Sequence, residues 1–132
     1  MKSFSRWLSP SVSGALPAPA QPVLIAGIVL LNQVFNAGAT IAFALSGKAE
    51  APSGFVVWQI LGGILGLGIQ ITFAGMVRFF SLQFANAVGI GLAFLSAQIV
   101  GALLFFREPF SPLQWLGSAL VFVGILFIAA GH

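Results

Sequence analysis

Four long stretches of this sequence contain no lysine, arginine, aspartate or glutamate, and they constrain the possible fold more than any other feature. An α-helix of about 20 apolar residues is long enough to cross the hydrocarbon core of a bilayer. Only 5% of all residues are charged, whereas a water-soluble domain carries about 25%. The pattern therefore predicts an all-α fold, a bundle of four transmembrane helices within residues 23–130. The predicted spans are Val23–Ser46, Phe55–Val77, Phe84–Phe106 and Leu113–Ala130.

Residues 1–22 differ from the rest because they are rich in serine and proline and include Lys2 and Arg6. This composition predicts a flexible polar tail at the N-terminus. A cleavable signal peptide is the alternative. Its apolar segment, Trp7–Leu16, is interrupted by serines and a proline, whereas signal peptides contain an unbroken apolar run of about 7–15 residues. We therefore favour the tail.

Two short motifs mark the boundary between the third and fourth spans. Arg107 and Glu108, followed by Pro109, indicate the end of a helix. We expect the Glu108 carboxylate to pair with Arg107 or with nearby backbone. Ser111 and Gln114 have the spacing of a capping box, and the residue after Ser111 is a proline, which favours the first helical position. The last span is therefore predicted to begin directly after Ser111.

The orientation in the membrane is weakly specified by charge. With four spans, Lys2, Arg6 and Arg78 lie on one side of the membrane, and Lys48 and Arg107 lie on the other. Lysine and arginine are enriched in cytoplasmic loops, so the count favours cytoplasmic termini by one residue. Because this margin is so small, insertion in both orientations is conceivable.

Several classes of function lack the residues that they need. The chain has no cysteine, and its single histidine, His132, is the last residue, so the sequence predicts neither a metal site, nor a cofactor, nor an enzyme. The basic residues are scattered, which argues against nucleic-acid binding. Glu50 and Glu108 both lie outside the spans. No span therefore offers a carboxylate for proton-coupled transport.

Polar side chains within the spans form the candidate substrate-binding site. Asn32, Asn36 and Thr40 recur every four residues, so they share one helix face. In the second span, two glutamines and two glycines form a narrow polar and small stripe. The alternative is that these residues only hold the helices together by hydrogen bonds and close packing. The predicted substrate-binding residues are Asn32, Asn36, Thr40, Gln59, Gln70 and Gln98.

Glycines in the last span repeat every seven residues, at Gly117, Gly124 and Gly131. Small residues along one helix face allow another helix to approach closely in a membrane. These three glycines are therefore predicted to form a dimer interface. Packing within the protomer is the alternative interpretation of the same glycines.

The stretch Phe105–Ile128 resembles the last two helices of the drug/metabolite transporter superfamily, which includes small multidrug resistance proteins and EamA-type transporters. The shared pattern is an aliphatic helix, a turn with Glu108, a polar and proline-containing helix start, and glycines seven residues apart. The resemblance implies a four-helix protomer in a dimer that is antiparallel or pseudo-symmetric. Small multidrug resistance members carry a membrane-embedded glutamate on the face where this chain has Asn32 or Asn36.

Together, these features predict one protomer of a dimeric transporter for a small polar metabolite or a lipid-linked head group. The predicted location is the cell inner membrane. The predicted partners are membrane lipids and a second subunit, either an identical copy or a sister protein. The alternative is a non-transporting membrane subunit that assembles or stabilises a larger complex.

Overall fold

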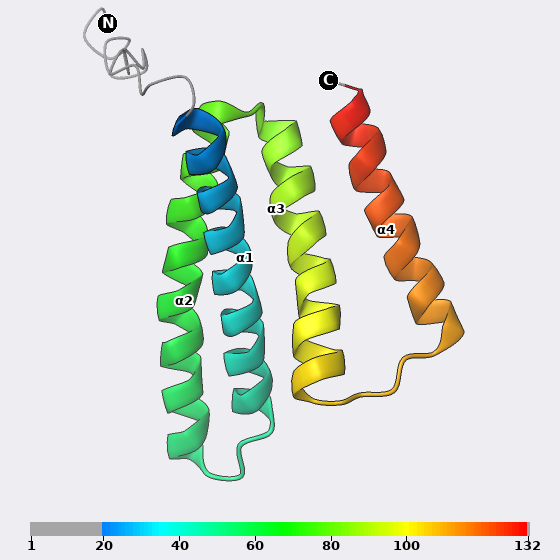
Figure 1. The fold of residues 1–132 in the computed structure, drawn as a ribbon. Helices are drawn as coiled ribbons and strands as arrows, with labels where there is room; N and C mark the ends of the chain where they lie inside the picture. Colours follow the sequence, from blue (N-terminus) through cyan, green and yellow to red (C-terminus); the bar gives the residue numbers. More distant parts are fainter. Residues whose placement is uncertain (1–19, 132) are drawn as a thin grey trace, which may run out of the picture.

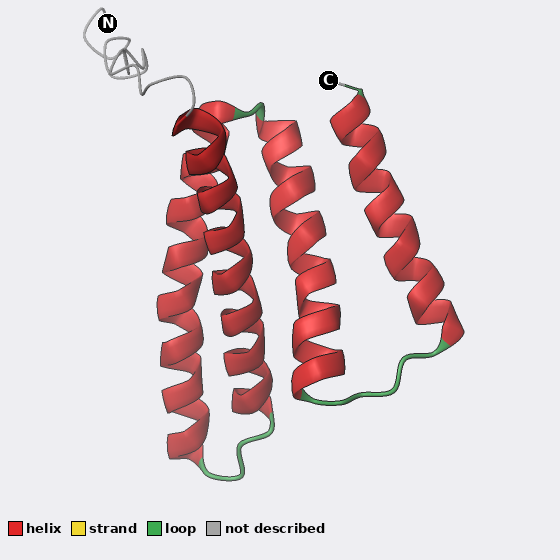
Figure 2. Cartoon of the chain, viewed as in Figure 1, coloured by secondary structure: helices red, strands yellow, loops and turns green. Residues whose placement is uncertain are grey.

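The computed structural model describes residues 20–131, so the predicted tail up to residue 19 and His132 lie outside the described residues. Within this range the chain is helical apart from short loops, and all four helical spans are long and apolar enough to cross a membrane (Figures 1 and 2). The prediction of an all-α, four-span fold is confirmed. The elements are α1 (Ala20–Gly47), α2 (Pro52–Phe79), α3 (Leu82–Ser96) continued by η1 (Ala97–Phe105), and α4 (Pro112–Ala130).

The predicted helix starts and turns follow from local hydrogen bonds. At the start of α4, the Ser111 hydroxyl accepts from the Gln114 backbone N–H at 3.3 Å. In the reciprocal hydrogen bond, Gln114 Oε1 accepts from the Ser111 backbone N–H at 2.7 Å. The capping box is therefore confirmed. Ser81 caps α3 in the same way, by accepting from the Phe84 N–H.

The third span departs from the sequence prediction, which treated residues 84–106 as one α-helix. Its last part, η1, is a π-helix, and Phe106 N donates to Gly101 O at 3.0 Å. The wider turns end where Arg107 adopts a left-handed conformation with φ of 53°. A hydrophobic run does not distinguish π from α hydrogen bonding, which explains why the sequence prediction missed η1. Helices of the π type are rare and often occur at functional sites.

The helices do not contribute equally to the packing. α1 and α2 lie side by side along their length, and α1 also contacts α3 and η1 (Figure 1). Gly62 and Gly68 permit the close approach of α2 to α1, because a Cβ atom on either would lie within 3 Å of the Phe43 or Phe35 ring. In the described chain, α4 packs against α3 and leans away from α1 and α2. The tightest part of the protomer is therefore the α1–α2 pair.

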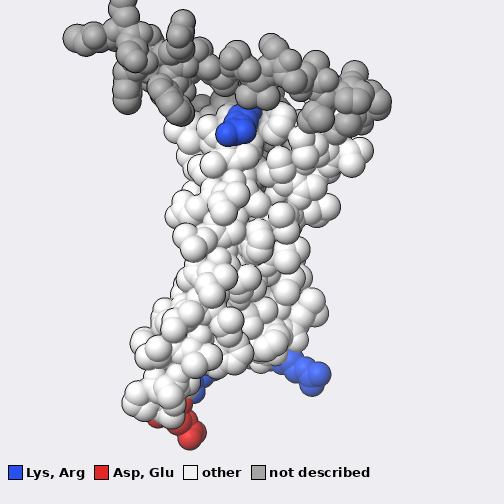
Figure 3. All heavy atoms as spheres, turned by 90° about the vertical axis from the view of Figure 1, so that its left-hand side faces the viewer, with Lys and Arg blue, Asp and Glu red and all other residues white. Residues whose placement is uncertain are grey.

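The surface has the character of a membrane protein. In Figure 3 the charged side chains lie at the two ends of the molecule, and the band between them shows none. Large apolar side chains of the spans, such as Leu30, Ile71 and Leu120, are exposed. Contact between this apolar surface and water is unfavourable, whereas contact with lipid chains is not. The chain is therefore a multi-pass membrane protein.

Candidate functional site

The centre of the protomer holds a group of polar side chains that we name the amide cluster: Asn32, Gln33, Asn36, Thr72 and Ser96. Asn32 lies at its middle and is 1% exposed. Its Nδ2 donates to Thr72 Oγ1 at 2.8 Å and to the Ile69 carbonyl at 3.2 Å, which joins α1 to α2. Its Oδ1 accepts from Asn36 Nδ2 at 3.0 Å and from Gln33 Nε2 at 3.3 Å. Both the nitrogen and the oxygen of the Asn32 side-chain amide are therefore hydrogen-bonded within the protein.

The amide cluster also reaches the third span. Ser96 Oγ, at the end of α3, donates to Gln33 Oε1 at 3.2 Å. The Thr72 hydroxyl lies 2.8 Å from the carbonyl of Gly68, one turn earlier in α2. Among the described residues, no buried side-chain nitrogen or oxygen is left without a hydrogen-bond partner. The cluster thus connects three spans through hydrogen bonds between uncharged groups.

Asn36 differs from Asn32 in having hydrogen-bonding capacity to spare. It is half-buried, and its Nδ2 donates to the Asn32 carbonyl at 2.9 Å as well as to Asn32 Oδ1. Within residues 20–131, no group donates a hydrogen bond to Asn36 Oδ1. This oxygen is therefore free to accept a hydrogen bond from outside the described chain.

The structure brings only part of the predicted binding site together. Asn32 and Asn36 meet as the four-residue spacing predicted. Thr40 is exposed, and its methyl group faces Gly101 of η1 across the α1–η1 contact. Gln59 and Gln70 are exposed on α2 and belong to no hydrogen bond of the described chain. Sequence spacing shows which residues share a helix face. Which elements pack against that face depends on the tertiary fold.

Two members of the cluster, Thr72 and Ser96, were not among the predicted site residues. Each is the hydroxyl side chain that meets an amide from another helix. A lone threonine or serine in an apolar span usually bonds to its own backbone, so the sequence offered no signal for either contact.

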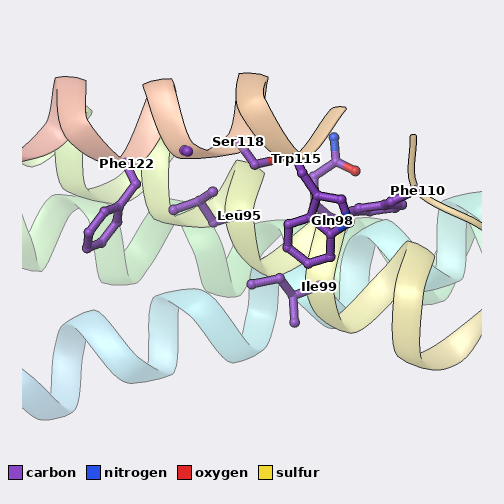
Figure 4. A pocket seen from close by; sticks show the side chains of 8 residues that line it. Leu95, Gln98, Ile99, Phe110, Trp115, Ser118 and Phe122 are labelled. Atoms are coloured by element: carbon purple, nitrogen blue, oxygen red, sulfur yellow. The ribbon is translucent and has the colours of Figure 1, made fainter. Parts of the chain in front are cut away.

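Gln98, the last predicted binding residue, lies at a separate cavity of about 280 Å³ between the third span and α4 (Figure 4). The lining is almost entirely apolar. Phe110 and Trp115 form an edge-on ring pair there, with centroids 5.4 Å apart. The cavity shares no lining residue with the amide cluster, so Gln98 lies apart from the other predicted binding residues. Its lining residues are Leu95, Gln98, Ile99, Phe110, Trp115, Ser118, Ala119 and Phe122.

The predicted partner of Glu108 was wrong. Its carboxylate pairs with Lys48, with Lys48 Nζ and Glu108 Oε1 3.7 Å apart, and not with Arg107. The α1–α2 and α3–α4 loops lie at the same end of the bundle, which brings these two charges together (Figure 1). Lys48 Nζ also lies 3.9 Å from the centre of the Phe106 ring. Glu108 of the helix-end motif therefore contacts the α1–α2 loop, whereas Arg107 takes no part in this ion pair.

Replacing Glu108 with glutamine is expected to change stability little. Both partners of the Lys48 pair are more than half exposed, at 57% and 56%, so water and salt screen their attraction. We expect a loss of about 0.5 kcal/mol or less in unfolding free energy, and a smaller loss at high salt. Unfolding in mixed detergent micelles at low and high salt measures it. A loss several times larger would show that this pair holds the two loops in place.

The glycines of α4 occupy different settings. A Cβ atom at Gly117 or Gly124 would meet no atom within 4 Å, so both face away from the protomer. Gly131 instead ends the helix, where its N–H donates to the Phe127 carbonyl at 3.0 Å. Two of the three glycines predicted to form a dimer interface therefore present an open face.

Comparisons with known proteins give one informative match. The chain is 36% identical over 80 residues to the uncharacterized protein y4nH of Sinorhizobium fredii. The match covers 58% of this chain and 66% of the relative, slightly less than two thirds of its length. No family model matches the chain, and neither does any solved structure. The fold and its surface place the chain among small four-helix membrane proteins.

Proposed function

We propose that this chain is one protomer of a dimeric transporter of the drug/metabolite transporter type, which moves a small polar metabolite or a lipid-linked head group. The amide cluster carries the proposal. Asn32 and Gln33 lie near the midpoint of α1, which spans residues 20–47, and so near the middle of the bilayer. Transporters bind substrates at this depth. Polar side chains in the bilayer interior are rare because they are costly, and they often mark a substrate path. The cell inner membrane, with cytoplasmic termini, is the proposed location.

The packing of the protomer suggests how access to the cluster would alternate. α1 and α2 form a tight pair, while one side-chain hydrogen bond, from Ser96 to Gln33, joins the third span to the cluster. Rocking of the third span and α4 against the α1–α2 pair breaks that single bond. Such motion of one helix group against another around a central site is the common mechanism of secondary transporters.

The chemistry of the cluster limits the energy source. Amides and hydroxyls provide hydrogen bonds but neither gain nor lose a proton in the physiological pH range. The spans of this chain contain no aspartate or glutamate. The proposed transport by this chain is therefore passive, or it is driven by a group that a partner subunit supplies. Proton-driven accumulation of drug-like cations by this chain alone is not expected.

Replacing Asn36 with alanine tests the proposal. Purified protein in lipid vesicles is screened for release of sugars, polyols, amines and organic cations, and for flipping of fluorescent lipid-linked sugars. We expect at least one class to move faster than in protein-free vesicles. Alanine removes the hydrogen bond that we propose Asn36 Oδ1 accepts from the substrate. We expect this loss to slow transport about tenfold.

The matched control is Leu120→Ala, because Leu120 is exposed on α4, away from the cluster. We expect this variant to transport at the wild-type rate. If Asn36→Ala and Leu120→Ala both transport as wild type does, the amide cluster does not bind the substrate.

The second candidate is a non-transporting subunit that assembles or stabilises a larger membrane complex. The complete hydrogen bonding of the buried polar groups favours it, since interhelical hydrogen bonds of this kind also serve as structural contacts. Under this function no solute class moves faster than in protein-free vesicles, while the Asn36→Ala protein still folds.

A further inference from the structure

Two backbone carbonyls fix the orientation of the amides in the amide cluster. A carbonyl oxygen only accepts hydrogen bonds, so the side-chain atom that faces it must be a nitrogen. The Ile69 carbonyl fixes Asn32 Nδ2, which lies 3.2 Å away. The backbone carbonyl of Asn32 fixes Asn36 Nδ2, 2.9 Å away. Asn32 Oδ1 then requires a donor from Gln33, whose Oε1 remains to accept from Ser96. The donors and acceptors of the cluster can therefore be counted atom by atom.

This count leaves two kinds of unused group. The Nδ2 atoms of Asn32 and Asn36 each make two hydrogen bonds, so neither has an N–H to spare. Asn36 Oδ1 accepts no hydrogen bond within residues 20–131. Since no buried side-chain oxygen in this range lacks a partner, Asn36 Oδ1 is accessible at the protein surface. Gln33 Nε2 makes a single hydrogen bond and keeps one N–H. The cluster thus offers a free acceptor and a free donor.

A third free group lies on the same face of α1. Gln33, Asn36 and Thr40 follow at intervals of three and four residues, and we name them the α1 polar line. At 1.5 Å per residue, the line is about 10 Å long. Thr40 is exposed, and its hydroxyl makes no hydrogen bond within the described chain. The line therefore combines an N–H, an amide oxygen and a hydroxyl.

The hydroxyl is the ligand group that matches both the free donor and the free acceptor, because it donates and accepts. A carboxylate or phosphate only accepts, and an ammonium only donates, so each leaves part of the line unpaired. Either charge would also lack a counter-charge. The four helical spans contain no charged residue except Arg78, in the last turn of α2. An unpartnered charge in the bilayer interior is unfavourable, so the line favours uncharged ligands.

We propose that the α1 polar line binds the hydroxyl groups of an uncharged polyol or sugar, either free in solution or as the head group of a glycolipid. Asn36 Oδ1 accepts from one hydroxyl, Gln33 Nε2 donates to another, and the Thr40 hydroxyl binds a third. This inference rests on the proposed function and names its substrate class.

Solutes with the same carbon chain test this class. Sorbitol, glucamine and gluconate end in a hydroxymethyl, an ammonium and a carboxylate group, and uptake of each into protein-containing and protein-free vesicles is compared. A second arm follows flipping of fluorescent glucosyl and glucuronosyl diacylglycerol, which differ by a carboxylate. In at least one arm we expect the neutral probe to move about tenfold faster than its charged analogues. Preference in the first arm identifies a free solute, and preference in the second arm alone identifies a glycolipid.

A pair of variants with the same side-chain shape shows whether the acceptor at residue 36 causes the preference. In Asn36→Thr the new hydroxyl donates to the carbonyl one turn earlier and keeps its lone pairs, whereas Asn36→Val offers no acceptor. We expect transport of the neutral probe to fall about tenfold in Asn36→Val and about twofold in Asn36→Thr. Leu120→Ala, exposed on α4, is the control and should transport as wild type does.

Equal rates for neutral and charged probes, or fastest transport of a charged probe, would overturn the inference and leave the proposed function standing. Equal losses in Asn36→Val and Asn36→Thr would also overturn it, because an acceptor at residue 36 would then not matter. The substrate class is also wrong if other solutes of the broader screen cross while polyols and sugars do not. If no solute or lipid crosses faster than in protein-free vesicles, the proposed function itself fails, and this inference fails with it.

Discussion

Replacing Asn32 with leucine is expected to destabilise the protomer more than any other exchange of one polar side chain. Asn32 is almost completely buried and makes four hydrogen bonds, to α2 and to its own helix. Leucine has a similar size but removes the acceptor of the Gln33 amide and one of the two acceptors of the Asn36 amide, which keeps the backbone carbonyl of residue 32. Two of the four hydrogen bonds are interhelical, and such bonds in membranes average about 0.6 kcal/mol each. With the loss of the other two and the unpaired Gln33 amide, we expect a total loss of about 2 kcal/mol.

Reversible unfolding in mixed detergent micelles, followed by circular dichroism, measures this loss. Asn86→Leu is the matched control, because Asn86 is exposed and makes no hydrogen bond within the described chain. It is expected to change the unfolding free energy by about 0.5 kcal/mol or less. Equal effects of the two substitutions would show that the amide cluster contributes nothing to stability.

Gly62→Leu is expected to force the α1–α2 pair apart. A Cβ atom at this buried position would lie 2.5 Å from the Phe43 ring, and a leucine side chain extends further along the same direction. Overpacking of this kind costs about 1–3 kcal/mol, and we expect the upper part of that range. Gly27→Leu, at a position with nothing within 4 Å, is the control and should behave as wild type.

The same unfolding measurement in a Phe43→Ala background shows whether the Phe43 ring causes the destabilisation by Gly62→Leu. If the ring is the obstacle, removing it should make Gly62→Leu much less harmful than in the wild-type background. Equal effects of Gly62→Leu in both backgrounds would show that some other contact limits the approach of the helices.

The sequence predicted those features that depend on neighbours along the chain. The four spans followed from length and absence of charge, and the capping box followed from Ser111, Pro112 and Gln114 alone. The Asn32–Asn36 contact followed from four-residue spacing. Each of these requires only the geometry of a single helix.

Features that depend on how helices pack were not predictable in this way. Thr72 and Ser96 became part of the amide cluster because the fold places them opposite Asn32 and Gln33. Gln59 and Gln70 share a face, as predicted, but that face points away from α1. Periodicity alone does not tell an inward face from an outward one, since in a membrane both are largely apolar.

The central claim is that the amide cluster lines a path for a polar solute, and labelling of Asn36→Cys tests it most directly. The variant has one cysteine, so a charged, membrane-impermeant thiol reagent reports the exposure of residue 36 to water from each side of sealed vesicles. Gly27→Cys and Leu120→Cys are the controls, because both positions are exposed on the outer surface of apolar spans. We expect residue 36 to react from at least one side and the controls to stay unlabelled. Complete protection of residue 36 from both sides, in protein that unfolds like the wild type, would contradict the claim and leave the amide cluster as a structural contact.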